Sequence, residues 1–369
     1  MKVKFSKLNI SDKNILTINK IIKSGWLTHG KFTQLFENEI KKITKAKYAI
    51  TVSSCTAGLH LSCIAAGFKN GDEVIVPAQT HTATAHAVEY TGAKAVLVDS
   101  EFPSGNISLK EIKKNITKRT KGLIVVHMGG YPCDMTSIAK FCKKKKLTLI
   151  EDCAHSVGTK WKKIHVGNFG ISGVFSFYPT KQITTGEGGA VFTNNKTIFN
   201  KIKKLKAFGI DKDLKDRKKP GEYNVNELGY NYRMTDFQAA LGYFQLKNYS
   251  KNIKRRHEIA KRYIKKFSKN KYIKFLPFDK NNSYFIFQVF CKNRDRVLLG
   301  LKKKNIGFSI HYLKPLNKMS YYKKKYNLMN KNFYNSNKFS NMNISLPNYP
   351  KLKNKEIDYI CNNIKKLCN

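Results

Sequence analysis

The sequence lacks several features that mark common classes of protein. It has no run of 18 apolar residues, so no ordinary transmembrane helix is predicted. Residues 1–14 contain no continuous apolar stretch of the kind found in secretory signals. The eight cysteines never form a C-x-x-C pair, and their spacings assemble no zinc site. We therefore expect a cytoplasmic protein with reduced, mostly buried cysteines, no metal and no membrane insertion.

Acidic residues and arginine are also scarce. The 24 Asp and Glu residues against 70 Lys and Arg residues give a formal net charge of +46, and only eight of those 70 are arginines. Arginine is the preferred reader of phosphates and bases, so its scarcity favours a lysine-decorated surface over a dedicated nucleic-acid interface. We expect no nucleic-acid partner, although a non-enzymatic basic nucleic-acid-binding protein is the alternative that the charge leaves open.

The 369 residues, 41% of them hydrophobic, are enough for two folded domains. Seven short apolar runs alternate, at first, with segments long enough for helices. Because the runs are almost continuously apolar, they predict an α/β fold with a mixed, mostly parallel seven-stranded sheet buried on both faces. The runs are YAITVSS, EVIVPA, KAVLVD, GLIVVHM, LTLIEDC, GVFSFY and GAVFTN.

A change in composition divides the chain. After residue 248 the sequence becomes lysine-rich and helical in pattern, then returns to a strand-like run at 284–290. We therefore predict a large domain over 1–245, including an N-terminal segment, and a smaller α+β domain over 246–369. Residues 323–343, rich in Lys, Asn and Tyr, are expected to form a surface excursion.

Three strand ends carry polar groups that could bind a ligand or take part in a reaction. In open α/β sheets, ligands bind outside the carboxyl ends of the strands. Residues 53–58 place hydroxyls and small residues before a helix, where they could cap it or hold a phosphate. Asp152 directly follows an apolar strand and could pair with a ring nitrogen, a metal or a ribose. Lys181 lies between a strand and a glycine-rich loop, where a desolvated amine can become a nucleophile.

A phosphate cradle, a carboxylate and a lysine are the set that a pyridoxal phosphate site requires. The amine forms the bond to the cofactor aldehyde, the carboxylate keeps the ring nitrogen protonated, and the cradle holds the phosphate. The fingerprints G-x-G-x-x-G and G-x-x-x-x-G-K-[ST] are absent at the strand ends, which argues against a dinucleotide or nucleoside triphosphate site.

Six ordered motifs resemble those of the DegT/StrS-type sugar aminotransferases, which are pyridoxal-phosphate enzymes of fold type I, like aspartate aminotransferase. The segment around Lys181, SFYPTKQITTGEGGAVFTN, carries the most specific resemblance. The other five are residues 24–30, VSSCTAGLHL, IEDCAHSVGT, ELGYNYRMTDFQAALG and IGFSIHYLKPL.

The resemblance implies roles for individual residues around the cofactor. Lys181 would bond covalently to the cofactor and move a proton between it and the substrate carbon. Asp152 would hold the pyridinium nitrogen, and His155 would lie near the ring hydroxyl. The residues implied to bind the cofactor phosphate are Cys55, Thr56 and Ser176.

The resemblance also implies a partner subunit and a substrate. Asn231 would reach the cofactor phosphate of the other subunit, which makes a homodimer with shared active sites necessary. Glu187, Arg233 and His311 are candidate substrate-binding residues. One position departs from the family: His81 follows a threonine where an aromatic residue usually stacks on the cofactor. An imidazole would stack more weakly, or would simply line the cleft.

Residues 130–135 and 227–236 most resemble enzymes that aminate C4 of UDP-linked 4-keto-6-deoxy-N-acetylhexosamines. We therefore expect transfer of an amino group from L-glutamate to a nucleotide-diphosphate ketosugar, in amino-sugar and polysaccharide biosynthesis. The alternatives on this scaffold are a nucleotide-sugar 3-aminotransferase and a sugar dehydratase. Relatives of the dehydratase type carry histidine in place of the catalytic lysine, so Lys181 speaks against the dehydratase.

Overall fold

The computed structural model describes residues 1–212, 217–328 and 331–368. Its central sheet has seven strands in the order β1-β9-β8-β5-β4-β2-β3. Strand β9 runs antiparallel to both of its neighbours, β1 and β8, and the other pairs in this sheet are parallel. The strands are β1 (Tyr48–Val52), β2 (Glu73–Pro77), β3 (Lys94–Val98), β4 (Thr120–Val126), β5 (Thr148–Asp152), β8 (Ser172–Ser176) and β9 (Gly189–Thr193). All seven apolar runs form strands, which confirms the predicted α/β class and sheet.

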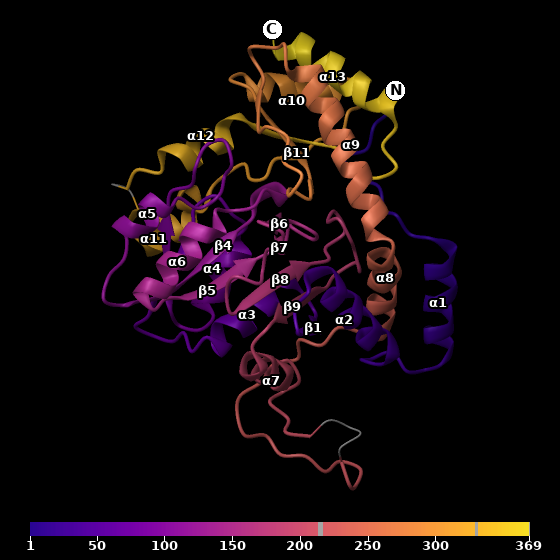
Figure 1. Cartoon of the computed structure of the whole chain (residues 1–369), viewed down its shortest axis with the longest axis vertical. Helices are drawn as coiled ribbons and strands as arrows, with labels where there is room; N and C mark the ends of the chain where they lie inside the picture. The colour runs from indigo at the N-terminus through magenta and orange to yellow at the C-terminus, as the bar shows by residue number, and fades with distance from the viewer. Residues whose placement is uncertain (213–216, 329–330, 369) are drawn as a thin grey trace.

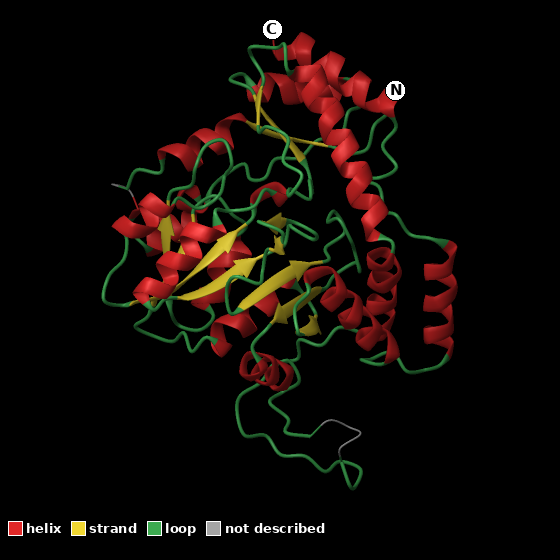
Figure 2. Ribbon diagram, in the orientation of Figure 1, coloured by secondary structure: helices red, strands yellow, loops and turns green. Residues whose placement is uncertain are grey.

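The sheet is buried on both faces because alternate side chains along each strand enter different cores. In β2, Val74 and Val76 belong to one buried cluster and Ile75 to another. Figure 2 shows helices packed around the strands. Each apolar face of the sheet needs such a covering layer. The helices of this part are α3 (Cys55–Ala65), α4 (Thr82–Glu89), α5 (Leu109–Lys114), α6 (Met135–Lys145) and α7 (Lys196–Leu205).

A second core contains most of the C-terminal elements, drawn in orange and yellow at the top of Figure 1. Its antiparallel sheet has the order β10-β11-β12. The elements are β10 (Lys274–Phe275), β11 (Phe287–Phe290), β12 (Asn343–Leu346), α9 (Tyr249–Phe267), α10 (Arg294–Lys303) and α13 (Asn354–Cys368).

The N-terminal segment packs into this second core. The Val3 side chain is buried in it, the Val3 N–H donates to the Asn305 carbonyl at 2.9 Å, and the Gly307 N–H donates to the Val3 carbonyl at 2.7 Å. In the other direction, Leu316 and Tyr322 pack in the core of the large sheet. The division at 245/246 stays a prediction, and these contacts cross it.

The segment 323–343 is only partly a surface excursion. Phe333 and Phe339 are buried, and helix α12 (Tyr334–Met342) packs beside β11, so the prediction is wrong for this half. These two phenylalanines, separated by mostly polar residues, anchor α12. Residues 329–330 of the segment lie outside the described part of the chain.

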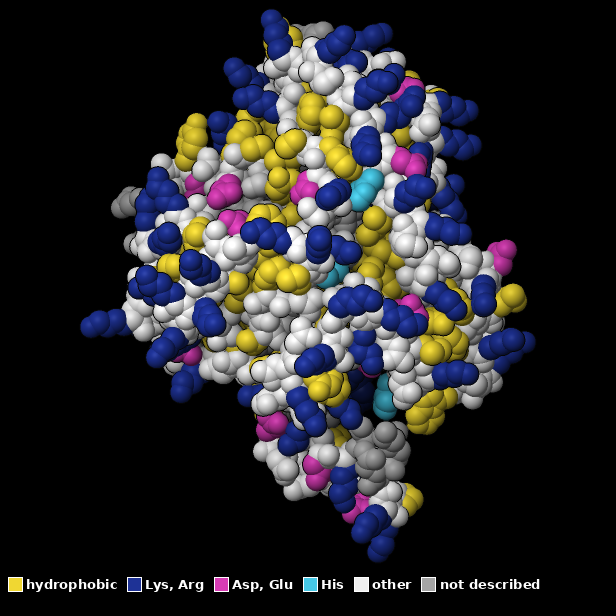
Figure 3. All heavy atoms as spheres, in the orientation of Figure 1, with side chains coloured by type: hydrophobic (Ala, Val, Ile, Leu, Met, Phe, Trp, Pro, Cys, Tyr) yellow, Lys and Arg dark blue, Asp and Glu magenta, His cyan; other side chains and the backbone are white. Residues whose placement is uncertain are grey.

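The remaining elements flank the large sheet or connect the two cores. They are α1 (Asp12–Lys23), α2 (Lys31–Thr44), β6 (Lys160–Trp161), β7 (Ile164–His165), α8 (Asp236–Lys247), α11 (Ser320–Lys325), η1 (Met128–Gly130) and η3 (Leu316–Lys318). Within the described ranges, no helix is both long and apolar enough to cross a membrane. Lysines and arginines are scattered over the whole face seen in Figure 3.

Candidate active site

A cavity of about 430 Å³ opens at the carboxyl ends of β5 and β8 and the start of α3. It brings together nine residues that the sequence predicts for the site, although they come from both halves of the chain. These nine are Cys55, Thr56, His81, Asp152, His155, Ser176, Lys181, Glu187 and His311.

The carboxylate of Asp152 is fixed in one orientation at the end of β5. One oxygen accepts a hydrogen bond from the Thr84 hydroxyl at 2.9 Å, and the other accepts the Ala154 N–H at 3.0 Å. The Thr84 hydroxyl lies 2.8 Å from that of Thr80. The sequence analysis does not identify Thr84 as a partner of Asp152. The i, i+4 spacing of Thr80 and Thr84 near a helix start is the sequence signal that could have indicated their contact.

Lys181 follows a tight turn in which its N–H donates to the Tyr178 carbonyl at 2.9 Å. Its Nζ lies 4.9 Å from the centroid of the Phe285 ring. Burial lowers the pKa of the Lys181 amine to about 8, although Cys55 and Asp152 act in the opposite direction. A neutral, nucleophilic amine is therefore accessible near physiological pH.

The start of α3 is the turn that the sequence predicts to hold a phosphate. Ser54 caps the helix by accepting the Ala57 N–H at 3.1 Å, and Cys55 and Thr56 form the first turn beside it. A side chain at Gly189 would place Cβ only 2.6 Å from the Cys55 nitrogen, so β9 can approach the turn only with glycine there. Burial raises the pKa of the Cys55 thiol, which keeps negative charge out of the cradle.

His155 is held as a neutral ring with a defined tautomer. Its Nδ1 accepts the Gly129 N–H at 3.3 Å, so its Nε2 carries the proton and donates to the Tyr312 hydroxyl at 3.2 Å. The ring stacks on Phe285 with centroids 4.7 Å apart. Burial, helped by the Lys181 ammonium, holds the pKa of His155 well below its usual range. Phe285 and Tyr312 were not identified from sequence.

Two further histidines line the cavity. His81 caps α4, where its Nδ1 accepts the Ala83 N–H at 3.2 Å, and its ring lies 5.7 Å from that of Tyr312. Burial and the nearby Lys181 lower the pKa of His81. His311 lies 2.9 Å from the Ser345 hydroxyl, and burial lowers its pKa to about 3. The lowered pKa of each of the three rings favours its uncharged form.

Asn231 and Arg233 do not line the cavity of their own chain. Asn231 is exposed, and the Arg233 guanidinium lies 5.1 Å from the Phe208 ring. The intervening Tyr232 carbonyl accepts the Ser53 N–H at 2.8 Å, so this segment is fastened to the strand end before α3. The roles assigned to both residues stay predictions.

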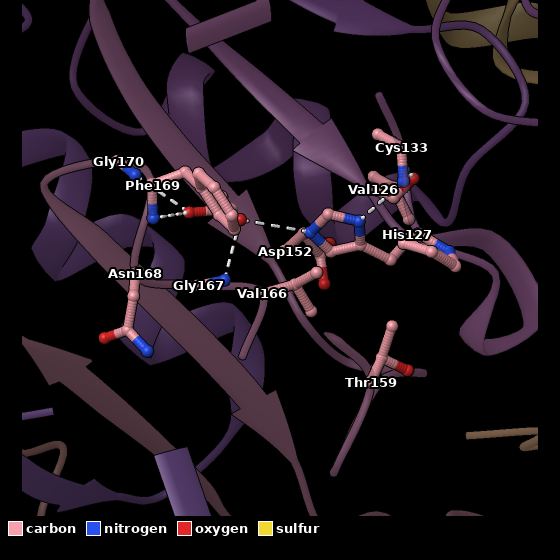
Figure 4. Close-up of polar contacts among 12 residues, drawn as sticks. Val126, His127, Cys133, Asp152, Thr159, Val166, Gly167, Asn168, Phe169 and Gly170 are labelled. Carbon is pink, nitrogen blue, oxygen red and sulfur yellow. Dashed lines mark hydrogen bonds and ion pairs between the residues drawn. The ribbon is translucent and has the colours of Figure 1, made fainter. Parts of the chain in front are cut away.

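A second carboxylate, Glu151, is fully buried and directly precedes Asp152 in the chain. Figure 4 labels the residues that surround it, among them His127, Gly167 and Phe169. Glu151 accepts backbone N–H groups from Gly167, Phe169 and Gly170 at 2.6, 2.7 and 2.8 Å. Its fourth partner is His127 Nε2, at 3.3 Å. Because successive residues of a strand face opposite sides, this network braces β5 from the side away from the cavity.

A lysine amine, a fixed carboxylate and a helix N-terminus thus meet at the carboxyl edge of a mostly parallel sheet. The donor set fits pyridoxal phosphate: an amine for the aldehyde, an acid for the ring nitrogen and N–H groups for the phosphate. The fold and the site define the class of fold type I pyridoxal-phosphate transferases. Within the described residues, no cluster of three or more His, Cys, Asp or Glu residues could hold a metal ion.

Comparisons with known proteins agree on one family. The model of the DegT/DnrJ/EryC1/StrS aminotransferase family matches residues 9–365, and the chain belongs to this family. GDP-perosamine synthase of Escherichia coli O157:H7 is 35% identical over 95% of this chain and 94% of its own. UDP-4-amino-4,6-dideoxy-N-acetyl-beta-L-altrosamine transaminase of Campylobacter jejuni is 35% identical over 87% and 86%.

A solved structure supports the same assignment. The pyridoxal-phosphate form of Spr1654 from Streptococcus pneumoniae has a TM-score of 0.92 and 27% identity, and the match covers 100% of this chain and 99% of that chain. The protein is therefore a pyridoxal-phosphate-dependent sugar aminotransferase. This confirms the cofactor and the class of enzyme inferred from the sequence, and it rules against the non-enzymatic nucleic-acid-binding alternative.

The lowered pKa of Lys181 predicts how cofactor capture depends on pH. With a pKa of about 8, about a tenth of the amine is neutral at pH 7 and about nine-tenths at pH 9. Covalent capture of pyridoxal phosphate by cofactor-free protein should therefore accelerate about tenfold between these values. Rapid-mixing absorbance measures the rate, with Lys181→Arg as the control that cannot react. A rise of about a hundredfold, which an amine with the ordinary lysine pKa of 10.5 would give, would contradict the lowered pKa.

Proposed function

We propose that the enzyme transfers an amino group from L-glutamate to C4 of a UDP-linked 4-keto-6-deoxy-hexosamine, in two half-reactions. The observation that carries the transamination is the presence of Lys181 and Asp152 in one cavity, beside the N-terminus of α3. The nucleotide-linked substrate is supported by the names of the relatives, one for a GDP-sugar enzyme and one for a UDP-sugar enzyme. The resemblance of residues 130–135 and 227–236 supports C4 and UDP.

Each half-reaction needs the same few actions from this chain. The cofactor supplies an electron sink that stabilises negative charge on the substrate carbon. Asp152 keeps the ring nitrogen protonated, and Thr84 holds that carboxylate in place. In one half-reaction the Lys181 amine moves a proton from the substrate carbon to the cofactor. In the other half-reaction it moves a proton from the cofactor to the substrate carbon. Cys55, Thr56 and Ser176 anchor the phosphate, so the ring stays oriented throughout.

His155, Glu187 and His311 have proposed roles beside the reacting atoms. His155 would approach the ring hydroxyl, with its proton and orientation already set by its two hydrogen bonds. Glu187 and His311 line the cavity and are proposed to contact the sugar. His81, which caps a helix at the same cavity, would cover the ring in place of the usual aromatic residue.

We also propose a cytoplasmic homodimer with shared sites. Its support is the placement of Asn231, which is exposed and lies outside its own cavity, where it is free to serve a second one. Arg233 is proposed to bind a substrate carboxylate. A nucleotide-sugar 3-aminotransferase remains the second candidate, because both reactions use the same cofactor site. The presence of Lys181 in the cavity disfavours a dehydratase.

A substrate panel tests the proposal. Purified enzyme is incubated with ¹⁵N-glutamate and UDP-, GDP- and dTDP-linked 4-ketosugars and 3-ketosugars, with Lys181→Ala as the inactive control. We expect mass spectrometry to show ¹⁵N in a UDP-linked 4-aminosugar. Labelling of a GDP sugar alone would correct the nucleotide, and labelling of a 3-ketosugar alone would correct the carbon. Labelling of none of the sugars by folded, cofactor-loaded enzyme would overturn the proposal.

A further inference from the structure

Two cysteines far apart in the sequence lie in contact in the second core. Cys291 directly follows β11, and Cys368 is the last residue of α13. Their sulfur atoms are 3.0 Å apart, although 77 positions separate them in the chain. Figure 1 shows α13 and β11 in the same upper part of the molecule. Both are free thiols in the structure, so a bond between them would be a new covalent link.

The end of α13 is held in place by packing as well as by this contact. The Leu367 side chain lies against Gly300 of α10 so closely that a Cβ there would be 2.3 Å from it. The side chain of Cys361, two helical turns earlier, is fully buried in the same core. The two sulfurs therefore meet at the end of a helix that packing already holds in place.

The two thiols differ in access and in acidity. Cys291 is buried, whereas Cys368 is only partly buried and can be reached by a small solute. The two thiols share a hydrogen bond, and their interaction lowers the pKa of Cys368 and raises that of Cys291. Burial raises the pKa of Cys361 to about 12, so that neighbouring thiol is comparatively inert.

We propose that Cys291 and Cys368 form a reversible disulfide when the enzyme meets a hydroperoxide. The Cys368 thiolate attacks the peroxide, an S–O bond forms, the O–O bond breaks, and hydroxide or an alkoxide leaves and takes up a proton. The Cys291 sulfur then attacks the Cys368 sulfur, the S–S bond forms and the S–O bond breaks, with loss of water. Both sulfurs are oxidised by one electron each, and the peroxide is reduced by two.

The bond would fasten the C-terminal helix to the small sheet. It would close a loop of 77 positions, and long closed loops remove the most freedom from the unfolded chain. The oxidised enzyme should therefore melt at a higher temperature, by about 5 °C, than the reduced enzyme. The bond between the two cysteines would form whichever sugar the enzyme aminates, and it can be detected without an activity measurement.

Peptide mapping of the holoenzyme after treatment with hydrogen peroxide tests the proposal. We expect a non-reduced digest to contain one cross-linked peptide that joins residues 291 and 368, two fewer free thiols per chain, and a melting temperature that dithiothreitol returns to its starting value. Cys368→Ala should lose all three effects, and the matched control Cys361→Ala, on the same helix, should keep them.

Three results would overturn the proposal. The first is a sulfinic acid at Cys368 with no cross-linked peptide. The second is a disulfide between two chains, visible as a doubled mass on a non-reducing gel. The third is a cross-link in the wild type that joins any other pair of cysteines. If Cys368→Ala does not fold, alkylation of Cys368 before oxidation gives the same comparison, and it should prevent both the link and the rise in melting temperature.

Discussion

Replacing Lys181 by alanine is expected to reduce transamination by at least about 10⁴-fold, because the same amine makes the covalent bond to the cofactor and moves the proton. No other described amine lines the cavity and could take over both tasks. Lys181→Arg keeps a positive charge but has no nucleophilic amine at accessible pH, so it should be equally inactive. The arginine variant thus separates the loss of a charge from the loss of a nucleophile.

Single-turnover absorbance with glutamate, the proposed amino donor, measures this effect before any sugar substrate is known. Borohydride reduction followed by mass spectrometry should find the cofactor attached at residue 181 in the wild type and nowhere in Lys181→Ala. Burial of the Lys181 ammonium costs free energy, so its removal should destabilise the protein little. The free energy of unfolding of the alanine variant should lie within about 1 kcal/mol of that of the wild type. A Lys181→Ala protein that still transaminates would refute the assignment of the catalytic amine.

Replacing Glu151 by alanine should lower the free energy of unfolding by about 3–5 kcal/mol. The buried carboxylate accepts three backbone N–H groups and the His127 ring, and no water-exposed surface is available to replace it. Glu151→Gln keeps the shape but turns one acceptor into an NH₂ group that faces donors, so it should also be strongly destabilising. The second nitrogen of His127 is already occupied by the Cys133 N–H at 3.1 Å, so the ring cannot change its tautomer to compensate.

Urea denaturation of the holoenzyme measures the loss. The matched control is Glu111→Gln, which breaks a surface ion pair with Lys114 at 2.8 Å and should change stability by about 0.5 kcal/mol or less. If Glu151→Ala were as stable as Glu111→Gln, the network would contribute nothing to β5. A Glu151→Gln variant as stable as the wild type would show that one carboxylate oxygen makes no net contribution.

Much of the site was accessible from sequence because its residues are placed by local rules. Asp152 and Ser176 end apolar strands, Cys55 begins a helix, and Lys181 precedes a glycine-rich loop. Parallel strands bring their carboxyl ends to one edge, so residues distant in the chain converge without further information. The seven strands could be predicted from the seven apolar runs, because strands in a sheet covered on both faces have almost continuously apolar sequences.

The residues that sequence analysis missed depend on tertiary contacts. Phe285 reaches Lys181 and His155 from the loop before β11, and nothing in its own neighbourhood marks it. The role of Tyr312 depends on its contact with the His155 ring nitrogen Nε2, which lies far from it in the sequence. Glu151 stands beside Asp152 and looks like an ordinary polar residue, but its partners lie in a loop 16 or more positions further along. Such roles follow from packing, which a single sequence does not display.

The burial of Val3 beside Asn305 and Gly307 has a consequence for biosynthesis. Chains emerge from the ribosome from the amino end, and early segments usually fold with their near neighbours. Here the segment around Val3 has to remain unpaired while the whole large sheet is translated, since its partners, Asn305 and Gly307, follow all seven strands of that sheet in the chain. Ribosome-bound nascent chains that stop short of Asn305 should therefore leave this segment open to proteases.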